Sequence, residues 1–345
     1  MIDREPIRCP ECAEQVEAPE NLDRRDFLRW LGGGTASLLA LGGASGGVRA
    51  AETPATKAAK PAEAMIRELY AALSPEQKKE LVLPWDHKTG NKLTRSGMYN
   101  RPIGRTIGDT YTPVQQEIIE RILRSISSGE EGYQQISREG DFDGSGSLQG
   151  CGATIFGEPA DGKKFSWVFT GHHLTVRCDG NSEEGAAFGG PMYYGHSPNG
   201  YSPRNVFFYQ TKRVLSVYEA LSEEQRKKAE VQGSPGEQEP SVRFRPAGQV
   251  RPGININELT KDQKDLVEKV MRDILSPYRK EDADEVMEIL KKNGGLEKIH
   301  LAFYEDSRMN DNQRWHFWRL EGPGFVWNYR VLPHVHTYVN ISSKV

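Results

Sequence analysis

The sequence has few cysteines, no excess of charge of one sign and no hydrophobic run of membrane-spanning length. Of its 345 residues, 45 are basic and 48 acidic, so the net charge is -3. Proteins that hold nucleic acid by its phosphates need a broad basic surface, which this balance does not supply. An apolar stretch from Trp30 to Ala44 has fifteen residues, whereas a spanning helix needs about 20. We therefore expect no nucleic-acid partner and no stable membrane anchor.

Motifs of several common enzyme classes are also missing. The sequence has no Walker phosphate loop and no Gly-x-Gly-x-x-Gly after a strand, which disfavours nucleotide and nicotinamide chemistry. The run Gly144 to Leu148 lacks the final glycine of a Gly-x-Ser-x-Gly nucleophile turn, which disfavours acyl-enzyme hydrolysis. With 35 glycines and 20 prolines the chain stays below the proportion found in low-complexity proteins. A folded core is therefore expected.

The first fifty residues have the features of an export signal. The run Asp23 to Arg29 contains paired arginines followed by an apolar pair, and it resembles a twin-arginine signal. The run Val48 to Ala50 offers a small residue at a cleavage point. We expect residues 1–50 to be removed, 51–63 to be a flexible leader, and 64–345 to form one large domain. The mature protein is then periplasmic or extracellular, and the twin-arginine translocase is its partner during export.

The four cysteines fall on both sides of this cleavage point. Cys9 and Cys12 have the spacing of half a zinc ribbon, but no second pair completes the site. Only Cys151 and Cys178 belong to the mature chain, where an oxidising compartment permits a disulfide between them. The sequence leaves open whether they pair. Because the twin-arginine route carries folded proteins, often with a cofactor, the signal is a weak indication of a metal or cofactor.

Capping motifs and apolar spacing predict five helices. A unit Leu-Ser/Thr-x-x-Gln begins at Leu73, Leu221 and Leu259, and its Ser or Thr stands three residues before Gln, as in a capping box. Each unit should begin a helix. Apolar residues every four positions predict a helix over Val114 to Ser127, and another is expected over Asp282 to Lys292. No longer match surrounds the repeated unit, which we interpret as recurring local chemistry.

Alternating apolar runs predict two pairs of strands. The first pair is Ala153 to Gly157 and Phe165 to Arg177, and the second is Trp315 to Leu320 and Phe325 to Val339. Helices cluster in the first third and the middle, while strands lie between them and at the end. This grouping predicts an α+β fold, mainly antiparallel, with several flanking helices. The stretch Gln232 to Gly253, rich in proline and glycine, reads as a long surface loop that can cross the face of a site.

Five of the eight histidines occur in three short motifs. His334 and His336 are two apart in the last predicted strand, so they should project to one face and can share a metal. His172 and His173 are adjacent in another predicted strand, and only one of them can join that pair. The flanking residues look buried on both faces, so either histidine remains possible. His196 follows in a loop.

Three imidazoles with an open fourth position form a versatile metal site. Zinc in such a site lowers the pKa of bound water, and copper or ferrous iron accept similar ligands. The alternative is that the histidines are ordinary core or surface residues. His196 is a candidate fourth ligand or proton shuttle, and two arginines four apart could clamp a carboxylate or phosphate. Besides the metal ligands, the candidate acids and binding groups are His196, Glu183, Glu184, Glu321, Arg101 and Arg105.

The acidic run Asp141 to Leu148 fits the first part of a calcium-binding loop. The twelfth position should hold a bidentate glutamate, and instead it holds Gly152. We therefore expect a tight acidic turn and no calcium.

Several of these motifs together resemble the bacterial family called domain of unknown function 3500. The shared residues are Phe156-Gly157-x-Pro159, Trp167-x-Phe169-x-Gly171-His172-His173-Leu174, Gly190-Pro191, Gly195-x-x-Pro198, and Gly322-Pro323 leading to His334-x-His336. Arg101 to Arg105 is similar to the early Arg-Pro motif of the family, so the resemblance runs from there to the C-terminus. The chain departs from the family in its short tail after His336 and its long loop before Gly253. The family is named for lacking a known activity, so the resemblance implies a shared site without a reaction.

The sequence therefore supports two functional hypotheses and a third, plainer one. The first is an exported metal-dependent enzyme acting on an unknown small molecule or carbohydrate, a hydrolase with zinc or an oxidoreductase with copper or iron. The second is a metal-free periplasmic binding protein for a carbohydrate or other organic ligand. Its groove would be lined by aromatic side chains, namely Trp167, Trp315, Trp318 and Trp327. The third is a scaffold in the cell envelope.

Overall fold

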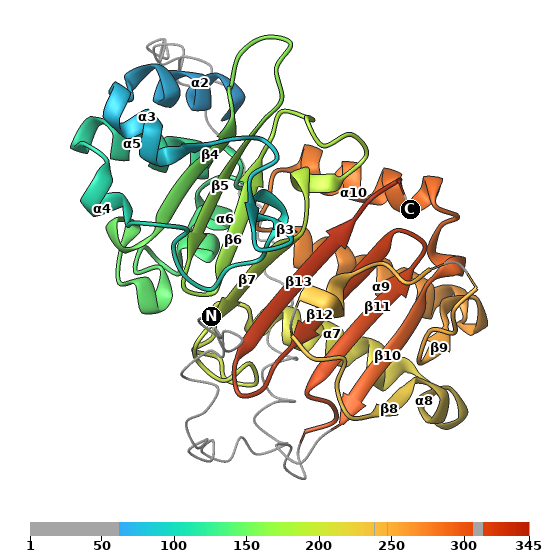
Figure 1. Cartoon of the computed structure of the whole chain (residues 1–345). Helices are drawn as coiled ribbons and strands as arrows, with labels where there is room; N and C mark the ends of the chain where they lie inside the picture. The colour runs from blue at the N-terminus through green and yellow to red at the C-terminus, as the bar shows by residue number, and fades with distance from the viewer. Residues whose placement is uncertain (1–61, 238, 247, 306–312, 345) are drawn as a thin grey trace, which may run out of the picture. The chain divides into compact units, whose positions relative to one another are not determined.

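A computed structural model of the chain describes residues 62–237, 239–246, 248–305 and 313–344 (Figure 1). The export signal, Cys9, Cys12 and nearly all of the predicted leader lie outside these ranges. Within them the chain folds into one α+β domain built on a mainly antiparallel sheet, which confirms the predicted fold class. Across the described residues, no helix is both long enough and apolar enough to cross a membrane.

One large sheet organises the domain. In spatial order its strands are β1 (Val82–Leu83), β4 (Gly152–Gly157), β5 (Phe165–Gly171), β6 (Leu174–Cys178), β7 (Met192–His196), β13 (Val335–Ile341), β12 (Phe325–Arg330), β11 (Phe317–Gly322), β10 (His300–Glu305) and β8 (Glu230–Gln232). Neighbours are antiparallel except β1 with β4 and β8 with β10. A short strand β9 (Ile254–Asn255) also pairs with β10, and β2 (Lys88–Thr89) pairs with β3 (Lys92–Leu93).

Helices occur where the sequence predicts them and at four further places in the described ranges. They are α2 (Ala62–Ala72), α3 (Pro75–Leu81), α4 (Ile107–Thr110), α5 (Pro113–Ser125), α6 (Glu130–Ser137), α7 (Phe208–Ala220), α8 (Glu223–Ala229), α9 (Lys261–Leu275) and α10 (Lys280–Lys292). Capping boxes are present at Ser74, Ser222 and Thr260, as predicted, and a further one is present at Thr112. The helices predicted from Val114 and from Asp282 correspond to α5 and α10. Helices α2, α4, α6 and α7 were not predicted.

The domain is an internal duplication. The order β1-β4-β5-β6-β7 in one half of the sheet is repeated in reverse as β13-β12-β11-β10-β8 in the other, so that β7 and β13 meet at the centre. In the first half Gln77 and Gln115 exchange side-chain hydrogen bonds of 2.8 and 3.0 Å, and in the second half Gln225 and Gln263 do the same. Both pairs are 38 residues apart. The recurring Leu-Ser/Thr-x-x-Gln unit is thus part of a structural repeat, and its interpretation as local chemistry alone was wrong.

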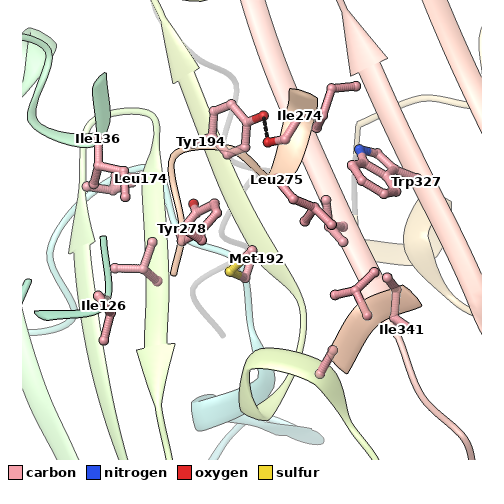
Figure 2. Close-up of a cluster of buried hydrophobic side chains, with 14 of the residues drawn as sticks. Ile126, Ile136, Leu174, Met192, Tyr194, Ile274, Leu275, Tyr278, Trp327 and Ile341 are labelled. Carbon is pink, nitrogen blue, oxygen red and sulfur yellow. Dashed lines mark hydrogen bonds between the residues drawn. The ribbon is translucent and has the colours of Figure 1, made fainter. Parts of the chain in front are cut away.

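One face of the sheet is apolar and packs against the helices. Side chains from strands and helices of both halves form one cluster, in which Trp327, Tyr194 and Leu275 are at most 1% exposed (Figure 2). The Tyr194 hydroxyl is satisfied by donating to the Ile274 carbonyl at 2.8 Å. The large side chains buried here include the four tryptophans considered for a ligand groove, Trp167, Trp315, Trp318 and Trp327, all 0% exposed. They are core residues, so they do not line a binding surface.

The opposite face is polar and is covered by two extended segments. The first strap (residues 84–106) follows β1 and leads to α4, and the second strap (the described residues 233–237, 239–246 and 248–253) follows β8 and leads to β9, so the two straps occupy corresponding places in the two halves. Thr175 on β6 exchanges hydrogen bonds of 2.8 Å with the backbone of Tyr99 in the first strap. On the second strap, the Val242 carbonyl accepts from Asn340 of β13 at 2.8 Å. The described residues of the loop predicted over Gln232 to Gly253 thus cross the polar face, in front of the sheet in Figure 1.

Candidate metal centre

His172 and His173 form the turn of a β-hairpin. Gly171 pairs with Leu174, so β5 ends before the two histidines and β6 begins after them. His173 adopts a left-handed backbone conformation with φ 50°. The prediction of one continuous strand from Phe165 to Arg177 was therefore wrong. Such turns usually carry glycine, asparagine or aspartate, so the residue types here do not predict a turn. Because the two histidines lie in a turn, strand alternation does not apply to their rings.

The second histidine motif lies where the chain enters β13. The predicted strand from Phe325 to Val339 is interrupted after Arg330, so His334 belongs to the connection and His336 to β13. The two rings nevertheless project to the same side, as predicted, and their Nε2 atoms are 2.9 Å apart.

Three histidine nitrogens converge at one point. The Nε2 atom of His334 lies 3.2 Å from Nε2 of His173 and 2.9 Å from Nε2 of His336. The three side chains are buried, with relative exposures of 0 to 3%. Ligand nitrogens about 2.0–2.1 Å from one tetrahedral zinc ion are about 3.3 Å from one another. The observed spacing is thus close to what a single ion requires, and the structure assigns His173, and not His172, to this group.

Carboxylates fix the orientation of two of the three rings. Nδ1 of His173 lies 2.8 Å from Oδ2 of Asp143, and Nδ1 of His336 lies 2.9 Å from Oε1 of Glu237. A carboxylate only accepts, so each Nδ1 carries the proton and each Nε2 presents a lone pair. This is the arrangement in which metal-binding histidines are usually held. A proton on Nε2 of His334 can form a good hydrogen bond with only one of these two lone pairs. One cation, in contrast, can bind all three Nε2 atoms.

Burial and hydrogen bonding together set the charge states of His173, His336 and Asp143. It lowers the pKa of His173 and of His336 well below the usual value, which favours the neutral imidazole that binds metals. Burial alone would raise the pKa of Asp143, but its hydrogen bond with His173, the nearby His172 ring and the charge of Arg138 outweigh that effect and hold the pKa well below its usual range. Asp143 is therefore a carboxylate beside the neutral ring of His173.

The acidic turn predicted over Asp141 to Leu148 positions the first carboxylate. Asp143 accepts hydrogen bonds from the Ser197 backbone N–H at 2.9 Å and from its hydroxyl at 2.5 Å. Leading into and through this turn, four residues other than glycine have left-handed backbones, namely Arg138, Glu139, Phe142 and Asp143. Such conformations cost of the order of 1–3 kcal/mol each and are concentrated at functional sites. The turn considered for calcium thus supplies the carboxylate partner of a histidine.

Arg138 connects the same segment to the hairpin turn. Its Nη2 donates to the carbonyls of His172 and His173 at 2.8 and 2.6 Å. In the second half Asn293, which also follows a helix, donates to the carbonyls of Pro323 and Ser342. The hairpin turn of that half carries Pro323 and Gly324 and offers no ligand. The repeat therefore builds two similar turns, of which the one in the first half carries the histidines.

Both straps reach the histidines. Asn100 of the first strap accepts from the His173 backbone N–H at 2.7 Å. Glu237 of the second strap pairs with Arg330 as well as with His336. Sequence reasoning missed Asp143, Glu237 and Arg138, because nothing near them in the sequence links them to a histidine. Their roles depend on contacts between distant parts of the chain.

The other predicted histidines lie nearby but point elsewhere. Nδ1 of His172 accepts from the Gly144 N–H at 3.0 Å, and Nδ1 of His196 accepts from the Val206 N–H at 3.0 Å. Asp143, His172 and His173 are close enough to form a second group, but the Gly144 and Ser197 donors already occupy its ligand atoms. The structure thus brings neither His172 nor His196 to the convergence point, and a proton-transfer role for His196 stays a prediction.

The remaining predicted residues are in ion pairs or on the surface. Glu321 is buried between Arg319 at 2.8 Å and Arg245 at 2.6 Å. Glu321 is on β11, two strands from the β13 strand that carries His336, and it is four residues further along β11 than the residue level with His336. Strand geometry therefore places the two residues roughly 16 Å apart. Arg101 and Arg105 are exposed on the first strap, and their role in substrate binding stays a prediction. Three of the predicted residues form further ion pairs: Arg105 with Glu80, Glu183 with Arg95, and Glu184 with Lys344.

Cys151 and Cys178 are both buried and both free thiols. The disulfide that an oxidising compartment would permit is not formed in this structure.

Fold and site together define an α+β protein, duplicated within one chain, with a buried cluster of three histidines. Residues 55–342 match the model of the family described as "Protein of unknown function (DUF3500)", and the chain belongs to this family. No curated protein and no solved structure matches the chain. The match confirms the family resemblance of the histidine motifs, and it supplies no reaction.

Proposed function

We propose that the protein is a metal-dependent enzyme in which His173, His334 and His336 bind one divalent transition-metal ion. The observation that carries the proposal is the convergence of their three Nε2 atoms, 2.9 and 3.2 Å from one another through His334. Support comes from Asp143 and Glu237, which hold two of the rings with their lone pairs directed inward. Three buried histidines without a shared ligand would not need carboxylates that direct the Nε2 lone pairs of two rings toward one point.

The ligand set favours zinc and hydrolysis. Blue-copper sites need a cysteine ligand, and ferrous oxygenases commonly use two histidines with a carboxylate. Here the carboxylates contact Nδ1 atoms, and both cysteines of the described chain are outside the cluster. Three neutral imidazoles leave the full charge of a zinc ion to acidify water at a fourth position. Copper or iron in the same site would instead support oxidation, while calcium prefers oxygen ligands.

We also propose that the enzyme works outside the cytoplasm, after export by the twin-arginine route. The paired arginines between Asp23 and Arg29 support this, together with the short apolar run that follows them. Changing Arg24 and Arg25 to lysine should keep the full-length precursor inside the cell. Immunoblots of periplasmic and cytoplasmic fractions test this, and unchanged periplasmic protein would contradict it.

Metal content tests the proposed site. Protein purified from the periplasm of its own host should contain about one metal ion per chain, because the site has one set of ligands. The double variant His334→Ala plus His336→Ala should lose the metal, and so should His173→Ala. His172→Ala is the matched control, since its ring is adjacent in sequence but accepts from Gly144. Absence of stoichiometric metal in the unaltered protein, or equal loss in the control, would refute the proposal.

A further inference from the structure

The second strap is fixed to the sheet largely through polar contacts. Four of its residues take part: Glu237 pairs with Arg330 and His336, the Ser241 carbonyl accepts from Arg319 at 2.5 Å, the Val242 carbonyl accepts from Asn340 at 2.8 Å, and Arg245 pairs with Glu321 at 2.6 Å. The apolar contribution comes from Val242 and Phe244, which pack against side chains of β7, β12 and β13. Directional contacts of this kind form or break together when a segment moves as a unit.

The ends of the strap are suited to movement. Gly233, Gly236 and Gly248 all have positive φ angles, and an added Cβ at any of them would meet nothing within 4 Å. Their backbones are therefore free of tight packing, and glycine adopts alternative conformations at low cost. The strap thus has unhindered glycines on both sides of the residues that contact the sheet.

The strap also closes the histidine cluster. The three ligand side chains are at most 3% exposed, whereas Glu237 above them is 27% exposed. A metal ion or a substrate reaches the Nε2 atoms only if some covering segment moves. Of the two straps, the second contributes a carboxylate directly to a ligand ring, through Glu237 and His336.

We propose that metal binding and closure of the second strap are coupled through Glu237, so that the strap acts as a metal-dependent latch over the site. This inference rests on the proposed metal function of the histidines. A cation at Nε2 of His336 makes the opposite Nδ1–H a stronger donor to Glu237, which strengthens the contact that holds the strap. Because coupling between two equilibria is reciprocal, a closed strap must in turn raise the affinity for the metal. Opening would uncover Tyr193 and Tyr338, which stack beside His336.

Hydrogen exchange on the full chain tests the latch, with zinc ion alone as the probe. The protein is stripped with a chelator and compared with and without zinc, while calorimetry measures binding on the same sample. We expect the amides of residues 241–245 to exchange at least about fivefold more slowly with zinc. Binding of zinc without this protection would overturn the latch and leave the metal site intact. No binding of zinc would instead overturn the proposed function on which the latch rests.

Two variants separate coupling from simple damage to the site. Glu237→Gln should bind zinc about 10- to 100-fold more weakly and lose the zinc-dependent protection, with Glu184→Gln, a surface carboxylate paired with Lys344, as control. Arg245→Gln changes a strap contact to Glu321, far from the histidines. If the strap and the metal are coupled, this variant must also weaken zinc binding, by about fivefold or more. Zinc affinity unchanged in Arg245→Gln, with exchange of 241–245 accelerated, would show that the strap moves independently of the metal and would refute the latch.

Discussion

Gly195 lies directly opposite His336 where β7 pairs with β13, and its missing side chain leaves the space in which the histidine rings meet. A Cβ at this position would stand 2.2 Å from the Val335 carbonyl oxygen, 3.1 Å from the His336 ring and 3.3 Å from the His173 Cβ. The first contact is with backbone, which cannot move aside without shifting the strand. The requirement for glycine here therefore links the central strand pair to the metal site.

Gly195→Ala should destabilise the protein and disturb the site together. Overpacking of a tight interior commonly costs about 1–3 kcal/mol, and the backbone contact places this substitution at or above the upper end of that range. Denaturant unfolding measures the loss of stability, and zinc titration of the folded fraction measures the loss of affinity. A variant as stable as the unaltered protein, with the same affinity, would show that the strands separate more easily than this geometry allows.

Asp143→Asn should weaken metal binding without unfolding the protein. The amide oxygen can still accept from Ser197, but the charge that orients Nδ1–H of His173 is lost. Loss of such a partner typically reduces metal affinity about 10- to 100-fold. Asp141→Asn is the control, because its side chain accepts from the Asp143 N–H and an amide oxygen can do the same. Competition with a chromophoric chelator gives both affinities, and equal values in the two variants would contradict the role of Asp143.

The two glutamine pairs provide a test of the duplication. Gln115 donates to the Ala72 carbonyl and Gln263 to the Ala220 carbonyl, at 2.8 and 2.7 Å, and each also exchanges bonds with its partner glutamine. Replacing either by leucine leaves buried polar groups unsatisfied, at about 1–3 kcal/mol each. Because the two environments are equivalent, we expect equal losses in the free energy of unfolding.

The double variant Gln115→Leu plus Gln263→Leu extends this test. The two sites are in different halves of the sheet and share no partner, so their effects should add to within about 0.5 kcal/mol. Denaturant unfolding of both single variants and the double variant provides the comparison. Losses that differ more than twofold between the single variants would mean that the two glutamine pairs are alike in geometry but not in energy.

Local chemistry was readable from the sequence, and long-range contacts were not. The Ser or Thr with Gln at capping-box spacing marked three helix starts, and the His-x-His spacing placed His334 and His336 together. The hairpin turn at His172 and His173 was missed because neither residue is typical of a turn. Asp143 and Glu237 were missed for a different reason. Each reaches its histidine through packing of segments far apart in the chain, and even the acidic turn expected over Asp141 to Leu148 does not indicate that one of its carboxylates contacts a histidine.

Metal should stabilise the folded chain through the three histidines. An ion that binds only the folded state adds about 2.7 kcal/mol to the free energy of unfolding when its free concentration is 100 times the dissociation constant. Zinc should therefore raise the unfolding temperature of the stripped protein, because it occupies lone pairs that otherwise face one another among buried side chains. His172→Ala should show the same increase, since its ring is not at the convergence point, and His334→Ala plus His336→Ala should show none. Calorimetric scans at fixed zinc concentrations measure the effect. An equal increase in the double variant would mean that zinc stabilises the protein from another site, and the assignment of these histidines as ligands would then be wrong.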